Sequence, residues 1–293
     1  MDNFIVLYNP LAGNGTAQDK MRELESLMQG DRLYFSNMLD IRDYGVFFND
    51  MPDGASIIIC GGDGTLNRFL NDTEDIRPDC DIYYYPSGSG NDFARDIGAE
   101  RGAPPVLINR YIERLPKICV NGKEHRFING IGYGIDGYCC EKGDVLRGKG
   151  DGEVNYTAIA IKGLLFHYKP TGATITVDGV EHRFEKVWLA PTMIGRYYGG
   201  GMMPTPEQDR LNGDGAVSVM VYYGSGKLKS LAVFPSIFKG EHIKHGEMVA
   251  VLSGRNITVC FDEPRPLQID GETVPGVREY SVTACEEKVL QPA

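Results

Sequence analysis

The sequence has little of what marks a secreted, membrane-spanning or nucleic-acid-binding protein. Its longest helical apolar stretch, residues 156–168, is interrupted by Lys162 and falls short of the roughly 20 residues that span a bilayer. The first ten residues have neither a basic region nor a small-residue cleavage site, so we expect no secretory leader. The formal net charge of −10 disfavours nucleic acid as a general partner. These absences indicate a cytoplasmic protein without a transmembrane segment.

Cysteine is present, but not in a pattern that builds a zinc site. The seven cysteines form an odd set without a CxxC pair, and Cys139 and Cys140 are adjacent, so their side chains point in different directions. We expect reduced, mostly buried thiols, as is usual in the cytosol. An acidic chain of this kind must bind an anionic substrate through local hydrogen-bond donors or through a metal ion.

The pattern of predicted strands and helices changes near residue 114. Before it, strand-like runs at 4–8, 32–35, 56–60 and 81–86 alternate with helical patterns at 16–29 and 39–48, the second capped by Asp40. This alternation predicts an α/β domain over 1–114, with a parallel sheet covered on both faces. After it, short strands joined by turns such as Asp178-Gly179 predict an antiparallel β-rich domain over 115–278, interrupted by helices at 153–167 and 228–238.

Three of the predicted parallel strands are followed by glycine loops, at 8–15, 60–67 and 85–92. Ligands of open α/β sheets bind beyond the carboxyl ends of the strands, and successive backbone N–H groups there attract anions. A nucleotide triphosphate is the natural ligand for three such loops. No P-loop sequence occurs, and the GxGxxG at Gly132, Gly134 and Gly137 lies in the β-rich half, outside any clear strand–turn–helix unit.

Asp63 stands at the centre of the second glycine loop, where a carboxylate would repel phosphate unless a cation lay between them. Mg²⁺ binds one or two carboxylates together with phosphate oxygens, so we expect Asp63 to act on Mg²⁺-bound ATP, directly or through water. The alternative is an Asx turn that stabilises its own loop. Asp92 is a second candidate carboxylate for the same ion, or else the N-cap of its own helix.

At these residues the sequence resembles the diacylglycerol kinase catalytic-domain family, which includes bacterial lipid kinases and is related to sphingosine and ceramide kinases. The family's GGDGT signature is here residues 61–65, its NPxxGxG strand end is 9–15, and its segment ending in NDFAR is 86–95. The resemblance continues through NGIGYGID at 129–136, the stretch 206–219 and IDGE at 269–272. The motifs follow the family order along nearly the whole chain, whereas GGDGT alone is shared with NAD kinases and phosphofructokinases.

The resemblance implies an N-terminal α/β nucleotide-binding domain, similar to NAD kinases and phosphofructokinases, and a C-terminal antiparallel β-sandwich, with the active site in a cleft between them. It also implies that residues 279–293 return to the first domain. The nucleotide-binding residues that it implies are Asn9, Pro10, Gly13, Ser36, Gly61, Gly62, Asp63, Gly64, Thr65, Asn67, Ser89 and Asp92.

Two further sites follow from the resemblance. Glu272, after the turn glycine Gly271, would be the base that removes the proton of the lipid hydroxyl; the alternative is a solvated turn acid. Asp214, with the backbone carbonyls of Leu211 and Ala216, would hold a second, structural Mg²⁺; the alternative is an ordinary Asp-Gly turn. The chain departs from the family where many bacterial members have a lysine in the first loop, since this loop reads AGNG.

The expected activity is an ATP- and Mg²⁺-dependent transfer of the γ-phosphate to a lipid hydroxyl, above all from diacylglycerol to phosphatidic acid. The alternatives are an NAD kinase-like or other small-molecule kinase and a catalytically inactive nucleotide-binding regulator. Residues 226–245 carry four lysines, one glutamate and apolar residues at helical spacing, which is typical of a segment that lies on the inner face of a membrane. The alternative is a helix packed on the β domain. A homodimer is among the expected assemblies.

Overall fold

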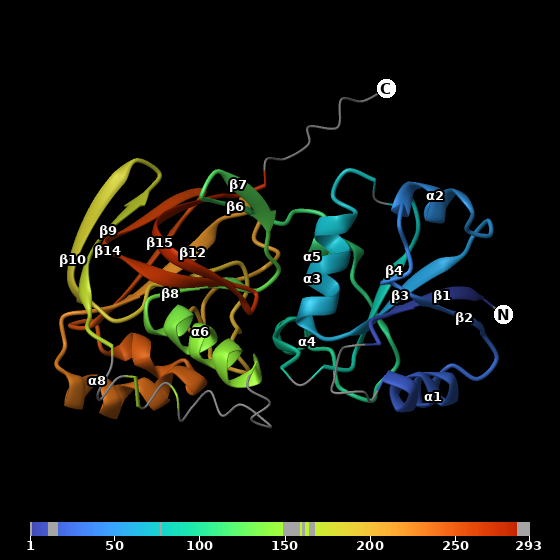
Figure 1. Ribbon diagram of the computed structural model, residues 1–293, viewed down its shortest axis with the longest axis horizontal. Coiled ribbons are helices and arrows are strands. Elements are labelled where there is room, and N and C mark those ends of the chain that lie inside the picture. Colours follow the sequence, from blue (N-terminus) through green and yellow to red (C-terminus); the bar gives the residue numbers. More distant parts are fainter. Residues whose placement is uncertain are drawn as a thin grey trace. The chain divides into compact units, whose positions relative to one another are not determined.

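The computed structural model describes residues 2–10, 17–76, 78–88, 90–148 and 168–285, together with the single positions 159, 162 and 163. The chain forms two compact units, Met1–Glu113 and Arg114–Ala293 (Figure 1). The sequence predicts a boundary near residue 114.

The first unit is built on a sheet with the strand order β2-β1-β3-β4-β5. Four strands are parallel, β1 (Asn3–Tyr8), β2 (Arg32–Asn37), β3 (Ser56–Gly61) and β4 (Ile82–Pro86), and the short β5 (Val106–Leu107) is antiparallel to β4. All of β3 after Ser56 is buried, as expected of a central parallel strand that reads as a continuous apolar run. The parallel sheet predicted from the sequence is confirmed.

Helices pack on both faces of this sheet. They are α1 (Ala17–Leu27), α2 (Tyr44–Asn49), α3 (Asp63–Asp72), α4 (Asp92–Ile97) and α5 (Asn109–Ile112). Leu24 of α1 shares a core cluster with Tyr85 of β4, whereas the neighbouring Tyr84 makes an edge-on contact with Phe93 of α4. Since successive side chains of a strand point to opposite faces, α1 and α4 cover different faces of the sheet.

Helix α2 starts later than the sequence predicted. Its N-cap is Asp43, whose carboxylate accepts hydrogen bonds from the N–H groups of Gly45 and Val46 at 2.8 and 3.1 Å. Asp40, the predicted cap, instead accepts a bond from the Asn37 amide at 3.0 Å. Either aspartate satisfies the composition rule for a cap, and only the turn that follows β2 decides between them.

The second unit is an antiparallel β-sandwich. Its sheet follows the order β13-β12-β11-β8-β14-β15-β6-β7, and β9 joins β10 to β14. The strands are β6 (Lys117–Val120), β7 (Lys123–Arg126), β8 (Gly130–Tyr133), β9 (Thr171–Val177), β10 (Val180–Val187), β11 (Thr192–Met193), β12 (Val217–Tyr222), β13 (Val249–Gly254), β14 (Asn256–Ile269) and β15 (Glu272–Thr283).

The long strand β14 changes partners along its length. Its first part pairs with β9 and its last residues pair with β8, while β15 follows it throughout. The register with β15 shifts between Cys260 and Arg265, and Pro264 and Pro266 lie in and beside this irregular stretch. Bulges bend a strand and proline removes a ladder donor, so this stretch is where β14 can pass from one part of the sandwich to the other.

The helices of the second unit are α6 (Ile135–Gly148), α8 (Lys227–Val233) and the 3-10 turns η3 (Phe234–Lys239) and η4 (Glu241–Lys244). The predicted helix 228–238 thus consists of an α-helix followed by a 3-10 turn. The predicted helix 153–167 falls almost entirely outside the described residues. Helix α6 directly follows β8, so the GxGxxG stretch does lie on a strand–turn–helix unit, contrary to the expectation from sequence.

The C-terminal segment does not return to the first unit within the described residues. Residues 279–283 belong to β15, which pairs with β14 and, through Ser281, Val282 and Thr283, with β6. The predicted return of these residues to the first unit is therefore wrong, because β15 pairs with β14 and β6 within the sandwich. Residues 286–293 lie outside the described part of the chain.

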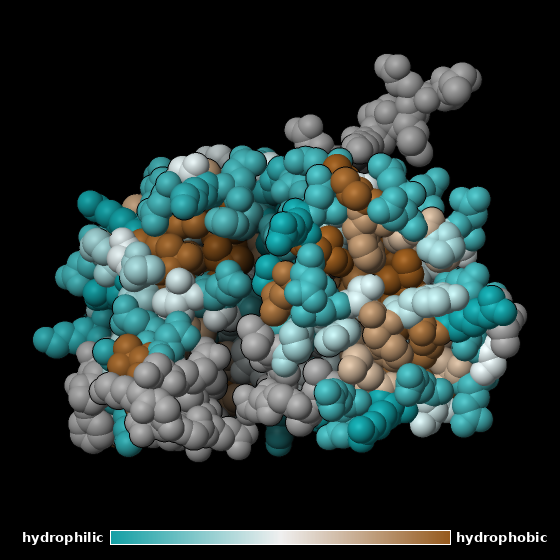
Figure 2. Space-filling view, turned by 45° about the vertical axis from the view of Figure 1, so that its right-hand side comes forward, coloured by the Kyte–Doolittle hydropathy of each residue, from teal (hydrophilic) through white to brown (hydrophobic). Residues whose placement is uncertain are grey.

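No described helix is long and apolar enough to cross a membrane. In the space-filling view, hydrophilic residues cover much of the visible surface, and apolar residues appear there in separate areas rather than as one continuous band (Figure 2). Candidate binding surfaces therefore have to be identified from local geometry.

Candidate active site

The predicted nucleotide-binding residues of the first unit gather at one edge of its sheet. The register pairs Tyr8 with Asn37 and with Cys60, and Gly61 with Pro86, so the four parallel strands end at about the same level. Asn9 and Pro10 follow β1, and Gly62 follows β3, at this edge. Gly13 and Ser89 lie outside the described residues. The second and third glycine loops meet at the carboxyl ends of the strands, where ligands of open α/β sheets bind.

Two of these loops touch backbone against backbone. A Cβ atom added at Gly88 would lie 2.5 Å from the Cα atom of Gly62, and one added at Gly62 would lie 3.1 Å from the Cα atom of Gly88. Likewise, a Cβ atom at Gly61 would come within 2.4 Å of the Thr65 side chain, which is buried. Glycine is therefore needed at 61 and 88 for close packing of the loops, in addition to any approach of a ligand.

Asp63 joins the two loops through its carboxylate. Its oxygens accept hydrogen bonds from the N–H groups of Asp92 and Phe93, both at 2.9 Å, at the start of α4. The N-cap residue of α4 is Asn91, which makes no side-chain capping bond, so Asp63 caps this helix from the neighbouring loop. The alternative of an Asx turn within its own loop is therefore wrong, and so is the alternative of Asp92 as N-cap.

The start of α3 offers backbone donors beside this junction. Asp63 is the first residue of α3, Gly64 is exposed, and the half-buried Asn67 lies one turn further along. The first N–H groups of an α-helix have no intrahelical acceptor, and the helix dipole favours an anion there. Asp92, which is buried at the first position of α4, adds a second carboxylate to the junction. Backbone N–H donors of α3 and the carboxylates of Asp63 and Asp92 therefore lie close together at this junction.

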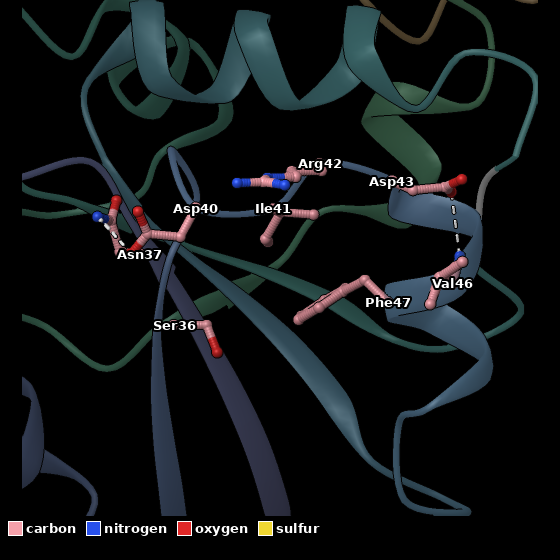
Figure 3. A pocket seen from close by; sticks show the side chains of 8 residues that line it. All are labelled: Ser36, Asn37, Asp40, Ile41, Arg42, Asp43, Val46 and Phe47. Carbon is pink, nitrogen blue, oxygen red and sulfur yellow. Dashed lines mark hydrogen bonds between the residues drawn. The ribbon is translucent and has the colours of Figure 1, made fainter.

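A hollow of about 540 Å³ lies between the end of β2 and helix α2 (Figure 3). Ile41 and Phe47 give it apolar walls, whereas Asn37 and Arg42 supply polar groups. Ser36, a predicted nucleotide contact, also lines it. Sequence motifs identify Ser36 but not the other lining residues, because the positions of those residues depend on where α2 begins.

In the second unit, Glu272 follows a tight turn. Asp270 and Gly271 have φ values of 46° and 96°, and Ile269 pairs with Glu272, as in a two-residue hairpin turn with a left-handed backbone. The Asp270 carboxylate accepts hydrogen bonds from the N–H groups of residues 128, 129 and 130, at 2.6, 2.9 and 3.0 Å. The Glu272 residue is exposed on this anchored turn.

Two of the three predicted metal ligands of the second unit, Asp214 and Ala216, already have other partners. The Asp214 carboxylate accepts a hydrogen bond from the Ala216 N–H at 3.2 Å, and the Ala216 carbonyl accepts two bonds, from the amides of Gln208 at 2.9 Å and Asn212 at 2.8 Å. The Arg255 guanidinium donates to the Asp214 carbonyl. Among the described residues, no cluster of three or more His, Cys, Asp or Glu side chains could hold a metal ion.

This loop does not fit a structural magnesium ion. Both lone pairs of the Ala216 carbonyl are used by amide donors, and a guanidinium stands where a second positive charge would be repelled. The surroundings of Asp214 and Ala216 therefore do not support the prediction that these two residues and Leu211 form a metal site. The alternative of an Asp-Gly turn describes the loop, with Gly215 at a φ of 69°.

The lysine-rich segment combines both alternatives considered from the sequence. Leu231 and Phe234 pack against the core of the second unit, as a helix docked on the β domain requires. Leu228, by contrast, is 80% exposed, and Phe238 is 43% exposed. Lys229 forms a 2.8 Å ion pair with Glu247. The apolar residues at helical spacing are thus divided between the core and the surface.

Comparisons with known proteins agree with this two-domain architecture. Residues 3–117 match the profile of the diacylglycerol kinase catalytic domain, and residues 129–286 match that of the YegS C-terminal NAD kinase beta sandwich-like domain. The two profiles together cover most of the chain. The chain belongs to the diacylglycerol kinase catalytic-domain family of lipid kinases.

Curated relatives carry corresponding names. The chain is 27% identical over 246 residues to a diacylglycerol kinase of Mycobacterium tuberculosis, covering 81% of this chain and 77% of the relative. It is 29% identical over 224 residues to a diacylglycerol kinase of Bacillus subtilis strain 168, covering 74% and 70%. A solved diacylglycerol kinase structure from Bacillus anthracis strain Sterne matches with a TM-score of 0.59 and 19% identity, covering 97% of this chain and 94% of that one, which shows the shared fold.

Proposed function

We propose that the protein is an ATP- and Mg²⁺-dependent lipid kinase that transfers the γ-phosphate of ATP to a lipid hydroxyl, with diacylglycerol as acceptor and phosphatidic acid as product. The observation that carries this proposal is the junction of the two glycine loops through the Asp63 carboxylate, at the carboxyl ends of the parallel strands. The family and the names of the curated relatives support the choice of a lipid acceptor.

The phosphate donor would bind at this junction. The N–H groups of Asp63 and Gly64, the first two residues of α3, would face the phosphates, whereas those of Thr65 and Leu66 already donate to the Gly62 carbonyl. Each Asp63 oxygen accepts a single N–H, so each keeps a further lone pair, and Asp92 adds a second carboxylate beside it. These residues fit a magnesium ion bound directly or through water. When bound, Mg²⁺ neutralises charge on the phosphates during transfer.

The nucleoside of ATP would occupy the hollow beside α2. A purine needs apolar walls for its faces and a few polar groups for its edge, and Ile41, Phe47 and Asn37 supply both kinds of contact. Ser36, the last-but-one residue of β2, lines the same hollow, where its hydroxyl could bond to ribose or phosphate. Because the AGNG loop has no lysine, positive charge at the nucleotide would come from backbone donors, the metal and Arg42, which lines the hollow.

Glu272 would take the proton of the acceptor hydroxyl. A general base must be accessible to its substrate and held in a defined position. Glu272 is exposed, and the turn that carries it is tied to residues 128–130 by the Asp270 carboxylate. As the hydroxyl oxygen attacks the γ-phosphorus, its proton passes to the Glu272 carboxylate, and the bond from the γ-phosphorus to the bridging oxygen of ADP breaks.

The α8 surface, defined here as Lys227, Leu228, Phe238 and Lys239, would touch the membrane that holds the lipid. Leu228 and Phe238 are exposed apolar side chains, and Lys227 and Lys239 are exposed basic ones. Apolar side chains enter the interface while lysines attract anionic headgroups. A peripheral enzyme of the inner membrane face would need such a reversible contact.

The acceptor is tested by measuring ATP consumption with a panel of acceptors in mixed micelles: diacylglycerol, monoacylglycerol, sphingosine, undecaprenol, phosphatidylglycerol and soluble NAD. We expect the highest kcat/KM with diacylglycerol and a requirement for Mg²⁺. Turnover of NAD in the absence of micelles would instead identify an NAD kinase-like enzyme. ATP binding without turnover of any acceptor would identify a catalytically inactive nucleotide-binding regulator.

A further inference from the structure

We propose that helix α6 positions Glu272, through Gln268 and Asp136 on one side of the turn and through Thr273 and Asp144 on the other. This inference rests on the proposed function only in taking Glu272 as the base. The connection itself consists of side-chain hydrogen bonds within the second unit. Gln268, Asp136, Thr273 and Asp144 are thus positioning residues, since none of them needs to touch a substrate.

The first connection reaches the turn through a buried amide. The Gln268 side chain is only 3% exposed; its Nε2 donates to Asp136 Oδ2 at 3.2 Å, and its Oε1 accepts from the N–H of Gly271 at 2.6 Å. Asp136 lies in the first turn of α6. The helix is thereby linked to the residue immediately before Glu272.

Asp136 also decides which way the Gln268 amide points. An ionised carboxylate can only accept, so it holds the NH₂ group of the amide and turns the carbonyl oxygen toward the Gly271 N–H. The reversed amide would place two donors against each other at Gly271 and two acceptors against each other at Asp136. The Asp136 carboxylate therefore fixes the hydrogen bond from the Gly271 N–H to Gln268 Oε1, although Asp136 takes no part in that bond.

Gly132 provides the room for this contact. A Cβ atom at Gly132 would lie 1.7 Å from Asp136 Oδ2 and 2.6 Å from Gln268 Nε2. At Gly137, a Cβ atom would lie 2.0 Å from the Pro266 carbonyl oxygen, so this glycine lets α6 pack closely on β14. Two glycines of the GYGIDG stretch thus serve helix packing and the acid–amide contact, which explains the motif without a dinucleotide.

The second connection reaches the residue immediately after Glu272. The Thr273 hydroxyl donates to Asp144 Oδ2 at 2.7 Å, and Asp144 lies two turns beyond Asp136 on the same helix. Helix α6 therefore holds the residues on both sides of Glu272. Because a misplacement of about 1 Å can cost a base a large part of its efficiency, both connections should affect turnover more than binding.

The acid at 136 gives the connection a pH dependence. Burial raises the pKa of the Asp136 carboxyl to about 6, although the hydrogen bond from Gln268 and the nearby Tyr198 hydroxyl favour its charged form. The titratable groups that act on it are the Tyr198 hydroxyl, from the loop after β11, and the thiol of Cys139 on α6; Cys140, on the same helix, acts on Tyr198. Burial raises the pKa of both Tyr198 and Cys139, so these two stay neutral near pH 6.

The test begins with Gln268→Met, which keeps the length of the side chain and removes both hydrogen bonds. The variant is compared with the unmodified protein by amide hydrogen exchange at Gly271 and by kinetics. We expect the exchange at Gly271 to speed up at least about tenfold, and kcat to fall at least about tenfold with an unchanged dissociation constant for ATP. Tyr222→Phe, which removes a buried hydroxyl bonded at 3.0 Å to the Ser230 carbonyl, is the matched control and should leave kcat within about twofold.

A double variant separates this inference from the proposed function. If Gln268 acts through Glu272, then Gln268→Met should cause no further loss of the residual turnover of a Glu272→Gln background. An equal loss in both backgrounds would overturn the positioning role, as would an unchanged kcat in Gln268→Met. Full activity of Glu272→Gln alone would instead remove Glu272 as base, while the exchange at Gly271 would still report whether the connection exists.

Asp136→Asn gives a second, milder test. The Asn side chain still offers a carbonyl acceptor to Gln268, so we expect near-normal kcat at pH 8 and slow exchange at Gly271. It cannot titrate, so a decline in the activity of the unmodified protein as the pH falls through about 6 should disappear in the variant. A kcat at pH 8 as low as that of Gln268→Met, or an unchanged acidic decline, would contradict the role given to Asp136.

Discussion

The glycine-loop junction of the first unit and the Glu272 turn of the second unit are built from the same dipeptide, Asp-Gly, with different results. In both, the aspartate binds backbone N–H groups of a segment far away in the sequence: Asp63 those of residues 92 and 93, Asp270 those of residues 128–130. After Asp63 the chain enters a helix, whereas after Asp270 it turns and continues as a strand.

This difference decides which chemical group each motif presents. A helix start presents backbone donors, which suit phosphates. A turn followed by a strand presents the next side chain, which here is the carboxylate of Glu272. The aspartate of each motif, Asp63 or Asp270, is thus a clip: its carboxylate joins two distant segments by hydrogen bonds. The residues beside it carry the proposed chemistry. Matched substitutions in the two motifs should therefore reduce ligand binding and stability to different extents.

The largest effect on ligand binding is expected where two backbones meet in the first unit. In Gly88→Ala, the new Cβ atom would lie 2.5 Å from the Gly62 Cα atom, and backbone cannot yield as a flexible side chain can. Overpacking of this kind costs about 3 kcal/mol, so we expect about 100-fold weaker ATP binding, measured by calorimetry. Gly90→Ala is the matched variant of the same loop: its Cβ atom would make an ordinary 3.5 Å contact with Asp63, and its loss should be much smaller.

The two aspartate clips should differ in their contributions to stability. Asp270→Ala leaves three backbone N–H groups without their acceptor, and Asp63→Ala leaves two. We expect the free energy of unfolding to fall by about 3 kcal/mol in the first case and about 2 kcal/mol in the second, measured by urea unfolding.

The fluorescence of Trp188, the only tryptophan in the sequence, shows in which unit each loss of stability occurs. Trp188 is buried in the second unit, so its fluorescence follows the unfolding of that unit, whereas circular dichroism follows both. The fluorescence transition should shift in Asp270→Ala and stay in place in Asp63→Ala. A shift of the tryptophan transition by Asp63→Ala would show that the clips are not confined to their own units.

The raised pKa of Asp136 predicts a pH dependence of stability in the second unit. Its folded pKa of about 6 lies above the ordinary value of 3.8, so the folded state holds the proton more tightly. The unfolded state therefore gains stability relative to the folded one as the pH rises from about 3.8 to about 6. Compared with Asp136→Asn, the unmodified protein should lose on the order of 2 kcal/mol between pH 4.5 and 7.5 in tryptophan-detected unfolding. A constant difference between the two proteins across this range would refute the assignment.

The smallest effect is expected on the α8 surface. Leu228→Asp replaces an exposed apolar side chain with an acid, and we expect about tenfold weaker binding to vesicles rich in phosphatidylglycerol. Val180→Asp is the control, because Val180 is also exposed, at 59%, but lies on the β9–β10 hairpin. Equal losses in the two variants would mean that added negative charge, and not the α8 surface, sets the affinity.

The sequence predicted the elements whose pattern is local. The parallel strands of the first unit are apolar runs bounded by glycine, and Asp178-Gly179 forms the expected hairpin between β9 and β10. Contacts between distant segments were not predictable in this way. Asp63 was expected to face a metal or its own loop, but it binds N–H groups about 30 residues later, and no periodic signal marks such a partner.

Residues with competing uses were misjudged for the same reason. Asp40 and Asp43 are both good caps, and Asp214 can serve a turn or an ion; the surrounding amides and Arg255 decide the second case. Gln268 gave no signal at all, since a buried amide in a strand looks like any polar residue of an alternating pattern. The GYGIDG stretch was noticed as a motif, but its purpose depends on Gln268 and on Pro266, about 130 residues away.

The central claim is that Glu272 is the base for the acceptor hydroxyl, and the most direct test is the kinetics of Glu272→Gln with diacylglycerol in mixed micelles. Glu279→Gln, which changes an exposed acid of the same strand, is the control. We predict that kcat of Glu272→Gln falls about 1,000-fold while the dissociation constant for Mg²⁺-bound ATP stays within about twofold, because the base acts only in the chemical step. A kcat within about threefold of that of the unmodified protein would contradict the account.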